Sequence, residues 1–256
     1  MSKTSAIYGR ELRYFFQSVT AYVVISIFLV ISGYFFFSIF RYYNLLSLQS
    51  MQSGFAPGGL NLIDGVVRPL LGNISIIILL LLPLLTMRLI AEEKKQGTFE
   101  LLSTYPVSDI AAVSGKFLAA LTVYAVMLGC TLLYPGMLLF FTEPETVPIV
   151  TGYIGLLLMG ASFIAMGTFF SSLTDNQIIA GVATFGASLF FLIIGWGAPF
   201  VGPKFAAVLA QISILYHFES FSKGVIETSD ATYYIFLTFF FLLLTVRSLE
   251  STRWKS

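Results

Sequence analysis

The chain has 256 residues, of which 57% are hydrophobic and 11% are charged, whereas soluble domains carry roughly 25% charged residues. A net charge of +1 with no basic cluster argues against a nucleic-acid partner, and the single cysteine, Cys130, excludes an intrachain disulfide or a metal site built from several cysteines. Apolar runs of about 20 residues recur without alternating, which predicts an all-α integral membrane protein rather than a membrane β-barrel.

The first predicted element is an amphipathic helix over residues 3–19. Its apolar positions repeat at helical spacing and are Tyr8, Leu12, Phe15, Phe16 and Val19. The polar residues Arg10, Arg13 and Gln17 lie elsewhere on the helix. The pattern predicts a helix lying in the lipid headgroup region with its apolar face down. The alternative is a frayed N-terminus.

Six apolar segments are predicted to cross the membrane as helices. They cover about residues 20–40, 69–89, 117–141, 149–170, 178–194 and 231–246. Pro83 removes a backbone hydrogen bond inside the second span and predicts a kink there. The sixth segment is short, so we expect it either to extend to Leu249 or to thin the bilayer.

The connections differ in character. Residues 41–66 contain Gly54, Pro57 and further polar residues, which favours a loop. Residues 195–231 contain several helix breakers and one apolar piece, 206–218, that is too short to span. Small residues recur in the fourth and fifth spans, and such surfaces allow close helix packing. These residues are Gly152, Gly155, Gly160, Gly167, Gly181, Gly186, Ala161, Ala165, Ala183 and Ala187.

An even number of spans places both termini on one side of the membrane. With the N-terminus inside, ten of the 14 Lys and Arg residues fall on the inner side. The positive-inside rule therefore predicts cytoplasmic termini and a cytoplasmic stretch over residues 88–116.

Sequence signatures of catalysis are absent. Gly115-Lys116 has Ile110 in place of the first glycine of a phosphate-binding loop and Phe117 in place of its hydroxyl residue. We therefore expect no catalytic residue, no bound ATP and no metal on this chain, which is not an enzyme by this reasoning. Almost every charge maps to a loop or a helix end, which argues against an autonomous ion or proton carrier.

His217 is the single histidine and lies beside Glu219. It could bind a metal or sense pH, or it could be an interfacial polar residue. One histidine with one carboxylate makes a poor metal site, so the second interpretation is favoured.

The stretch over residues 88–116 is the long charge-rich run between the second and third spans. Ala91–Gln96 is predicted to continue the second span as a charged helix that Gly97 ends. Thr98 can begin a second short helix, which Pro106 stops.

Ser108 and Asp109 are good capping residues for a third helix that leads through Lys116 into the third span. The stretch is thus predicted to be a stiff helical connection that passes force into spans two and three. The alternative is a solvated anchor that only fixes the orientation of the spans.

The same stretch resembles the signature of ABC-2 type transporter permeases, and within them most closely the gliding-motility-type and NosY-like subunits. The matching residues are Met87-Arg88, Ala91-Glu92-Glu93-Lys94-Lys95, Gly97-Thr98, Glu100-Leu101-Leu102, Pro106-Val107-Ser108 and Gly115-Lys116-Phe117-Leu118. Ser171 to Gln177 and His217 to Ile226 add to the resemblance, which covers essentially the whole chain.

The resemblance implies six spans, short outer helices between spans five and six, a dimer of permeases in the inner or plasma membrane, and a separate ATP-binding subunit that carries ATP and Mg. It places the contact with that subunit on the N-terminal helix and on coupling helices in residues 88–116. The implied interface residues are Arg10, Arg13, Arg88, Glu92, Glu93, Lys94, Lys95, Gly97, Thr98 and Glu100.

The expected function is that of a permease subunit that couples ATP hydrolysis by its partner to export or movement of an unknown substrate. The alternative is a non-transporting membrane anchor or force transmitter acting on an extracytoplasmic partner protein. Glu92 and Glu93 could pair with basic residues of the ATP-binding subunit, and reversing both charges should then abolish its stimulation.

Overall fold

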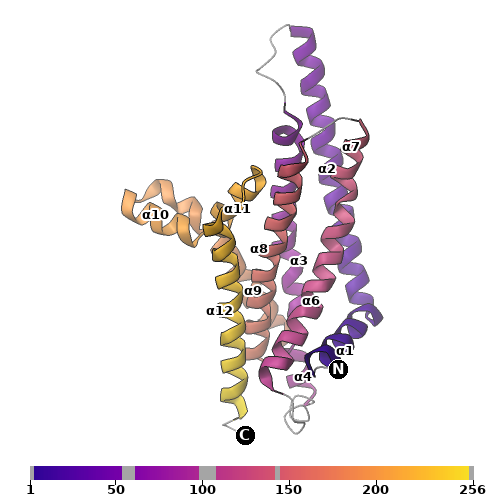
Figure 1. Ribbon diagram of the computed structural model, residues 1–256. Coiled ribbons are helices and arrows are strands. Elements are labelled where there is room, and N and C mark those ends of the chain that lie inside the picture. The colour runs from indigo at the N-terminus through magenta and orange to yellow at the C-terminus, as the bar shows by residue number, and fades with distance from the viewer. Residues whose placement is uncertain (1–2, 54–60, 98–107, 142–144, 254–256) are drawn as a thin grey trace.

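A computed structural model describes residues 3–53, 61–97, 108–141 and 145–253, and every regular element in these ranges is a helix. Figure 1 shows them as a bundle of long, roughly parallel helices, with α1 and α4 at one end and α10 projecting from the side. In chain order they are α1 (Lys3–Gln17), α2 (Val19–Ser53), η1 (Ile63–Val67), α3 (Arg68–Thr86), α4 (Ala91–Lys95), α6 (Asp109–Thr131), α7 (Leu133–Phe141), α8 (Thr146–Leu173), α9 (Gln177–Ile193), η2 (Ile194–Phe200), α10 (Pro203–Ile212), α11 (Ile214–Ser222) and α12 (Thr228–Arg253).

Six stretches of the described chain are long and apolar enough to cross a membrane. They are Val19–Ser50, Ile63–Lys95, Asp109–Leu138, Thr146–Leu173, Gln177–Phe200 and Thr228–Ser251. The predicted fold class, an all-helical membrane protein with six spans, is therefore confirmed. Of the two expectations for the sixth span, the extension to Leu249 is the one observed, because α12 runs past this residue.

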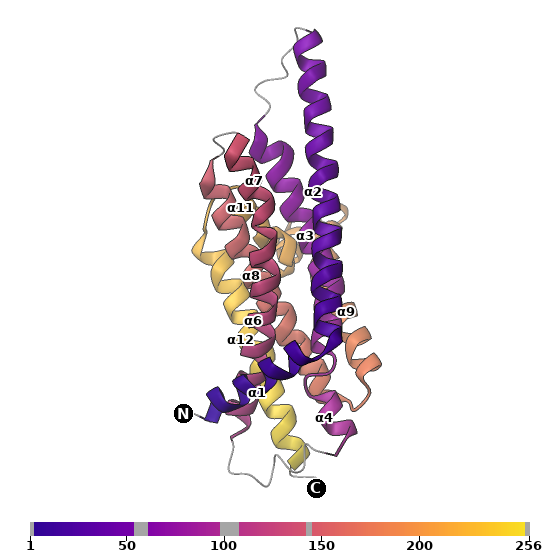
Figure 2. The ribbon, with the colours of Figure 1, turned by 90° about the vertical axis from the view of Figure 1, so that its right-hand side faces the viewer.

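The prediction of a loop over residues 41–66 is wrong for most of these residues, which are helical. The first spanning helix, α2, continues to Ser53, and η1 leads straight into α3. No Gly or Pro interrupts residues 34–53, so nothing in the backbone stops the helix where the side chains become more polar. As Figure 2 shows, α2 projects beyond the other helices at one end of the bundle.

The third span forms one helix with the predicted segment that begins at Asp109, and it breaks at Leu132 between α6 and α7. Pro135 explains this break, because it has no N–H to bond the carbonyl of Thr131 and its ring clashes with that carbonyl in a continuous helix. The N-terminal end of α6 is as predicted, since the Ser108 side chain accepts a hydrogen bond from the Ala111 amide.

Helix α8 lies at the centre of the bundle and packs against α3, α6, α9, α11 and α12. Its four glycines lie where these neighbours approach most closely. A methyl group added at these glycines would meet Leu71 (from Gly152), Phe221 (from Gly155), Tyr124 (from Gly160) and Thr86 (from Gly167). The predicted small-residue surface is therefore confirmed for α8, whereas Gly186 on α9 has no such neighbour within 4 Å.

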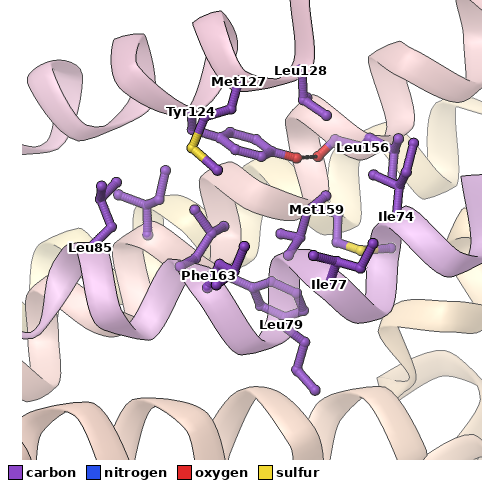
Figure 3. Close-up of a cluster of buried hydrophobic side chains, with 14 of the residues drawn as sticks. Ile74, Ile77, Leu79, Leu85, Tyr124, Met127, Leu128, Leu156, Met159 and Phe163 are labelled. Carbon is purple, nitrogen blue, oxygen red and sulfur yellow. Dashed lines mark hydrogen bonds between the residues drawn. The ribbon is translucent and has the colours of Figure 1, made fainter. Parts of the chain in front are cut away.

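The largest fully buried side chain near this surface is Tyr124. Its hydroxyl donates a 2.6 Å hydrogen bond to the carbonyl oxygen of Leu156, as Figure 3 shows. Met159 and Phe163 fill the space between α8 and α3 beside it. Since lipid is as apolar as these side chains, it is close packing and the tyrosine hydrogen bond that favour assembly of the helices.

Residues 194–222 form the three short helices η2, α10 and α11, in agreement with the segment predicted to be broken. His217 on α11 does not act with its neighbour Glu219. Its Nδ1 lies 2.7 Å from Asp230 Oδ1 of α12, and its Nε2 lies 3.0 Å from the Gln211 carbonyl oxygen. Through these two contacts His217 links α11 to α12 and to α10.

Candidate functional site

Three elements meet at the end of the bundle where α1 begins and α12 ends, namely α1, the α3–α4 connection and the start of α6 (Figure 1). Helix α1 packs across α6 and buries Ile7, Glu11 and Phe15. The close approach occurs at Gly115, where an added methyl group would lie 2.8 Å from Ile7 and 3.2 Å from the Thr4 carbonyl oxygen.

The helix predicted at the N-terminus is present as α1, which ends at Gln17 rather than at residue 19. Phe15 is buried, whereas Phe16 is 36% exposed and Val19 is 77% exposed. Val19 belongs to α2, because the chain turns at Ser18 and starts a new helix. The contact face also contains a buried carboxylate, Glu11, which is not among the predicted interface residues.

An ion network centred on the buried Lys116 joins the three elements. Lys116 Nζ of α6 lies 3.0 Å from Glu11 Oε1 of α1 and 2.9 Å from Glu93 Oε1 of α4. Arg10 Nη2 completes the network, 2.7 Å from Glu11 and 2.8 Å from Glu93. The Lys116 side chain is only 4% exposed. Buried charges of this kind are tolerated only when they are paired, so removing one member should destabilise the junction strongly.

The network also determines how its members titrate. Burial alone would raise the pKa of Glu11, but the charge of Lys116 and the hydrogen bond from Arg10 outweigh it, so the pKa lies below its ordinary value. Burial would lower the pKa of Arg10, but the two carboxylates Glu11 and Glu93 raise it above its ordinary value. Both groups are thus held in their charged forms at neutral pH.

Helix α4 carries Glu92 and Glu93 in its first turn and Lys94 and Lys95 in its last, an order that the helix dipole favours. Gly97 follows with φ of +69°, in the left-handed region that Gly adopts without strain, so the predicted helix end is confirmed. Helix α4 belongs to the second spanning stretch, Ile63–Lys95, as predicted, but four residues of turn separate it from α3, which ends at Thr86.

Beside the ion network lies a pocket of about 300 Å³. Its lining residues are Arg10, Glu11, Tyr14, Arg88, Leu89, Glu92, Glu93, Gln96 and Lys116. The Glu92 carboxylate accepts hydrogen bonds from the Tyr14 hydroxyl at 3.0 Å and from Gln96 Nε2 at 3.5 Å. Burial and this bond to Glu92 raise the pKa of Tyr14, so it stays protonated and can donate.

Arg88 stabilises the turn at Ser18 between α1 and α2. Its Nη1 donates to the hydroxyls of Ser18 at 3.2 Å and Thr20 at 3.3 Å. Its guanidinium lies 5.9 Å from the ring centres of Tyr14 and Phe15, within the range of a cation–π contact. Arg88 is thus built into the wall of the pocket.

The structure therefore separates the predicted interface residues into two groups. Arg10, Arg88, Glu93 and Lys94 bond within the chain, Lys94 through Nζ to the Ser172 carbonyl oxygen of α8. Arg13 and Lys95 are exposed, and Glu92 is half-buried with neutral partners. Thr98 and Glu100 lie outside the described residues, as does the short helix expected to begin at Thr98.

Glu11, Tyr14 and Lys116 of the junction are not among the interface residues that the sequence implies, although Lys116 belongs to the family signature. A signal for Glu11 was present, since this carboxylate falls on the same helix face as Tyr8, Leu12 and Phe15. A charge within an apolar stripe requires a partner, and only the fold shows that the partner is Lys116.

In chemical terms, the junction presents charged side chains beside an ion network that links α1, α4 and α6. Glu93 is occupied by Arg10 and Lys116, so reversing the charges of Glu92 and Glu93 together would break the network as well as change the surface. Among the carboxylates of the pocket, Glu92 is the one whose hydrogen-bond partners in the described chain carry no charge.

Comparison with families of known proteins matches residues 43–247 to the family described as ABC-2 family transporter protein. The matched segment runs from the last turns of α2 into α12 and covers well over half of the chain. It includes α4, Lys116 and the whole of α8, whereas α1 lies outside it. No curated protein matches the chain.

Proposed function

Because this chain belongs to the ABC-2 family of transporter proteins, we propose that it is the membrane subunit on which a separate ATP-binding subunit docks at the α1–α4–α6 junction. Family membership makes the chain a multi-pass membrane component of an ABC transporter and implies the ATP-binding partner. The docking site, the coupling of hydrolysis to movement and the substrate belong to the proposal.

One observation carries the placement of the docking site. The Glu11–Lys116–Glu93–Arg10 network, with Lys116 buried at its centre, joins α1, α4 and α6 into one body. A partner that pushes α4 therefore also moves α1 and the spanning helix α6. This mechanical connection supports coupling, which a solvated anchor would not need.

The surface that we assign to the partner consists of Arg13, Glu92, Lys95 and Gln96. These side chains are exposed or half-buried. Glu92 and Gln96 line the pocket beside the network, and Arg13 lines a second pocket along α1. Thr98 and Glu100 extend the same stretch in sequence and are proposed to belong to it. Arg10, Arg88, Glu93 and Lys94 hold the surface in place, and Gly97 turns the chain away from α4.

Three further parts of the proposal follow from the sequence and the family resemblance. The termini and the junction face the cytoplasm of the inner or plasma membrane, because the excess of Lys and Arg lies on their side. ATP and Mg are held by the partner subunit. Two permease copies act together, and the chain is nearest to the gliding-motility-type and NosY-like permeases.

A site-specific cross-link tests the docking site. We would place a photoreactive residue at position 13, 95 or 96, with position 204 on α10 as a matched exposed control. The proposal predicts that positions 13, 95 and 96 cross-link to a protein whose peptides include a phosphate-binding loop. Position 204 should not cross-link to that protein. Adducts with such a subunit at position 204 alone, or at none of the four, would overturn the placement.

The second candidate, a force transmitter that acts on an outer partner protein, is favoured by α2. This helix has 35 residues and is therefore about 50 Å long, although about 30 Å is enough to cross the hydrocarbon core. Its end projects beyond the bundle on the side opposite α4 (Figure 2). Co-purification of an outer protein that is released by truncating residues 44–53 would favour this candidate over transport.

A further inference from the structure

The break between α3 and α4 has a specific cause. In an uninterrupted helix the Ala91 amide would bond the Met87 carbonyl oxygen. Here the Ser171 hydroxyl of α8 lies between the two groups. Its oxygen accepts from the Ala91 amide at 2.9 Å, and the hydroxyl donates to the Met87 carbonyl at 3.0 Å. The same oxygen also accepts from the Ile90 amide at 3.0 Å.

A side chain inserted into the hydrogen-bond ladder is a known cause of sharp helix kinks. Ser171, Ile90 and Ala91 are all buried, so water is not available to replace the hydroxyl. One turn earlier on α8, Gly167 lies against the Thr86 side chain, and this close approach brings Ser171 within reach of α3. A single hydroxyl from a neighbouring helix thus takes the place of the missing main-chain hydrogen bond.

The same backbone groups have a second way to be satisfied. If Ser171 withdraws, Ala91 can bond Met87 directly and Ile90 can bond Thr86, which joins α3 and α4 into one helix from Arg68 to Lys95. We infer that the α3–α4 break is a two-state joint, with Ser171 as the positioning residue that holds it bent. Its role in coupling rests on the proposed function, whereas the joint itself does not.

The contacts of α4 indicate which helices would move when the joint straightens. Lys94 Nζ donates to the Ser172 carbonyl oxygen, and the Ser248 hydroxyl of α12 donates to the same oxygen at 3.5 Å. Straightening α4 would thus pull on the ends of α8 and α12. The sequence predicts force transfer into spans two and three, and the structure adds the central helix α8 as a direct recipient.

The test measures the bend in the purified chain in lipid nanodiscs. Spin labels at Ile76 on α3 and Gln96 after α4 would be introduced together with Cys130→Ala. We expect Ser171→Ala to lengthen the label distance toward the about 30 Å that 20 residues of straight helix span. Ser171→Thr, which keeps the hydroxyl, should retain the wild-type distance.

Ser172→Ala is the matched control, since the Ser172 hydroxyl donates within α8 to the Phe169 carbonyl oxygen. It should leave the distance unchanged. If Ser171→Ala gives the same distance distribution as wild type and Ser172→Ala, the inference is overturned.

A second arm adds the ATP-binding subunit with ATP or ADP. The distance should respond to nucleotide in the wild type and lose at least half of that response in Ser171→Ala. Failure of this arm alone would reject the coupling role and the proposed function, and would leave the joint intact.

Discussion

Lys116 and Glu11 are 105 residues apart in the sequence, yet Lys116 Nζ lies 3.0 Å from Glu11 Oε1 between two nearly buried side chains. This pair connects the first helix to the beginning of the third span. Glu93 shares the same lysine, so α4 is bound to both. Lys116 thus links α1, α4 and α6 at one end of the bundle.

Replacing Lys116 by Met should destabilise the chain by about 3 kcal/mol, because Glu11 and Glu93 would remain buried with only Arg10 to compensate them. Thermal unfolding in detergent would measure the loss. Lys95→Met is the matched control, since Lys95 is exposed, and its effect should stay within about 0.5 kcal/mol. Equal melting temperatures for the two variants would contradict the importance of the network.

Acidification should release α1. The folded-state pKa of Glu11 lies below its ordinary value of 4.5, so its stabilising contribution is complete above pH 4.5 and is lost as the pH falls through the lowered pKa. Melting temperatures measured from pH 7 to pH 3 should therefore fall more steeply for wild type than for Glu11→Gln. Parallel curves for the two proteins would show that Glu11 does not contribute this pH dependence.

Two glycine substitutions should have opposite consequences. Gly160→Ala places a methyl group against the ring of Tyr124 and should cost about 1–3 kcal/mol of stability. Gly186→Ala meets nothing within 4 Å and should be neutral or stabilise α9 slightly. Unfolding of the two variants in the same detergent measures the difference, and a tolerated Gly160→Ala would mean that the α6–α8 contact is loose.

The sequence predicts the features that depend on local patterns. Continuous apolar runs predict the six spans, Ser108 predicts the start of α6, and Gly97 predicts the end of α4. Each of these follows from a residue and its immediate neighbours, through hydropathy or backbone preference.

The errors have physical reasons too. Polar side chains in residues 41–53 suggest a loop, but helix formation there depends on the absence of Gly and Pro. The Glu11–Lys116 pair and the insertion of Ser171 beside Ala91 join residues far apart in sequence, so no local pattern shows them. The sequence suggests that the Glu93 carboxylate pairs with a partner protein, whereas in the structure it pairs with Arg10 and Lys116 of the same chain.

The most direct test of the docking site separates Glu92 from Glu93. Stimulation of the ATP-binding subunit's ATPase would be measured with the purified chain carrying Glu92→Lys, with Glu93→Gln as the variant that weakens the network instead. We expect Glu92→Lys to melt like wild type and to reduce the affinity for the ATP-binding subunit by about tenfold or more, with loss of stimulation. Glu93→Gln should lower the melting temperature. Full stimulation by a well-folded Glu92→Lys chain would contradict docking at the α1–α4–α6 junction.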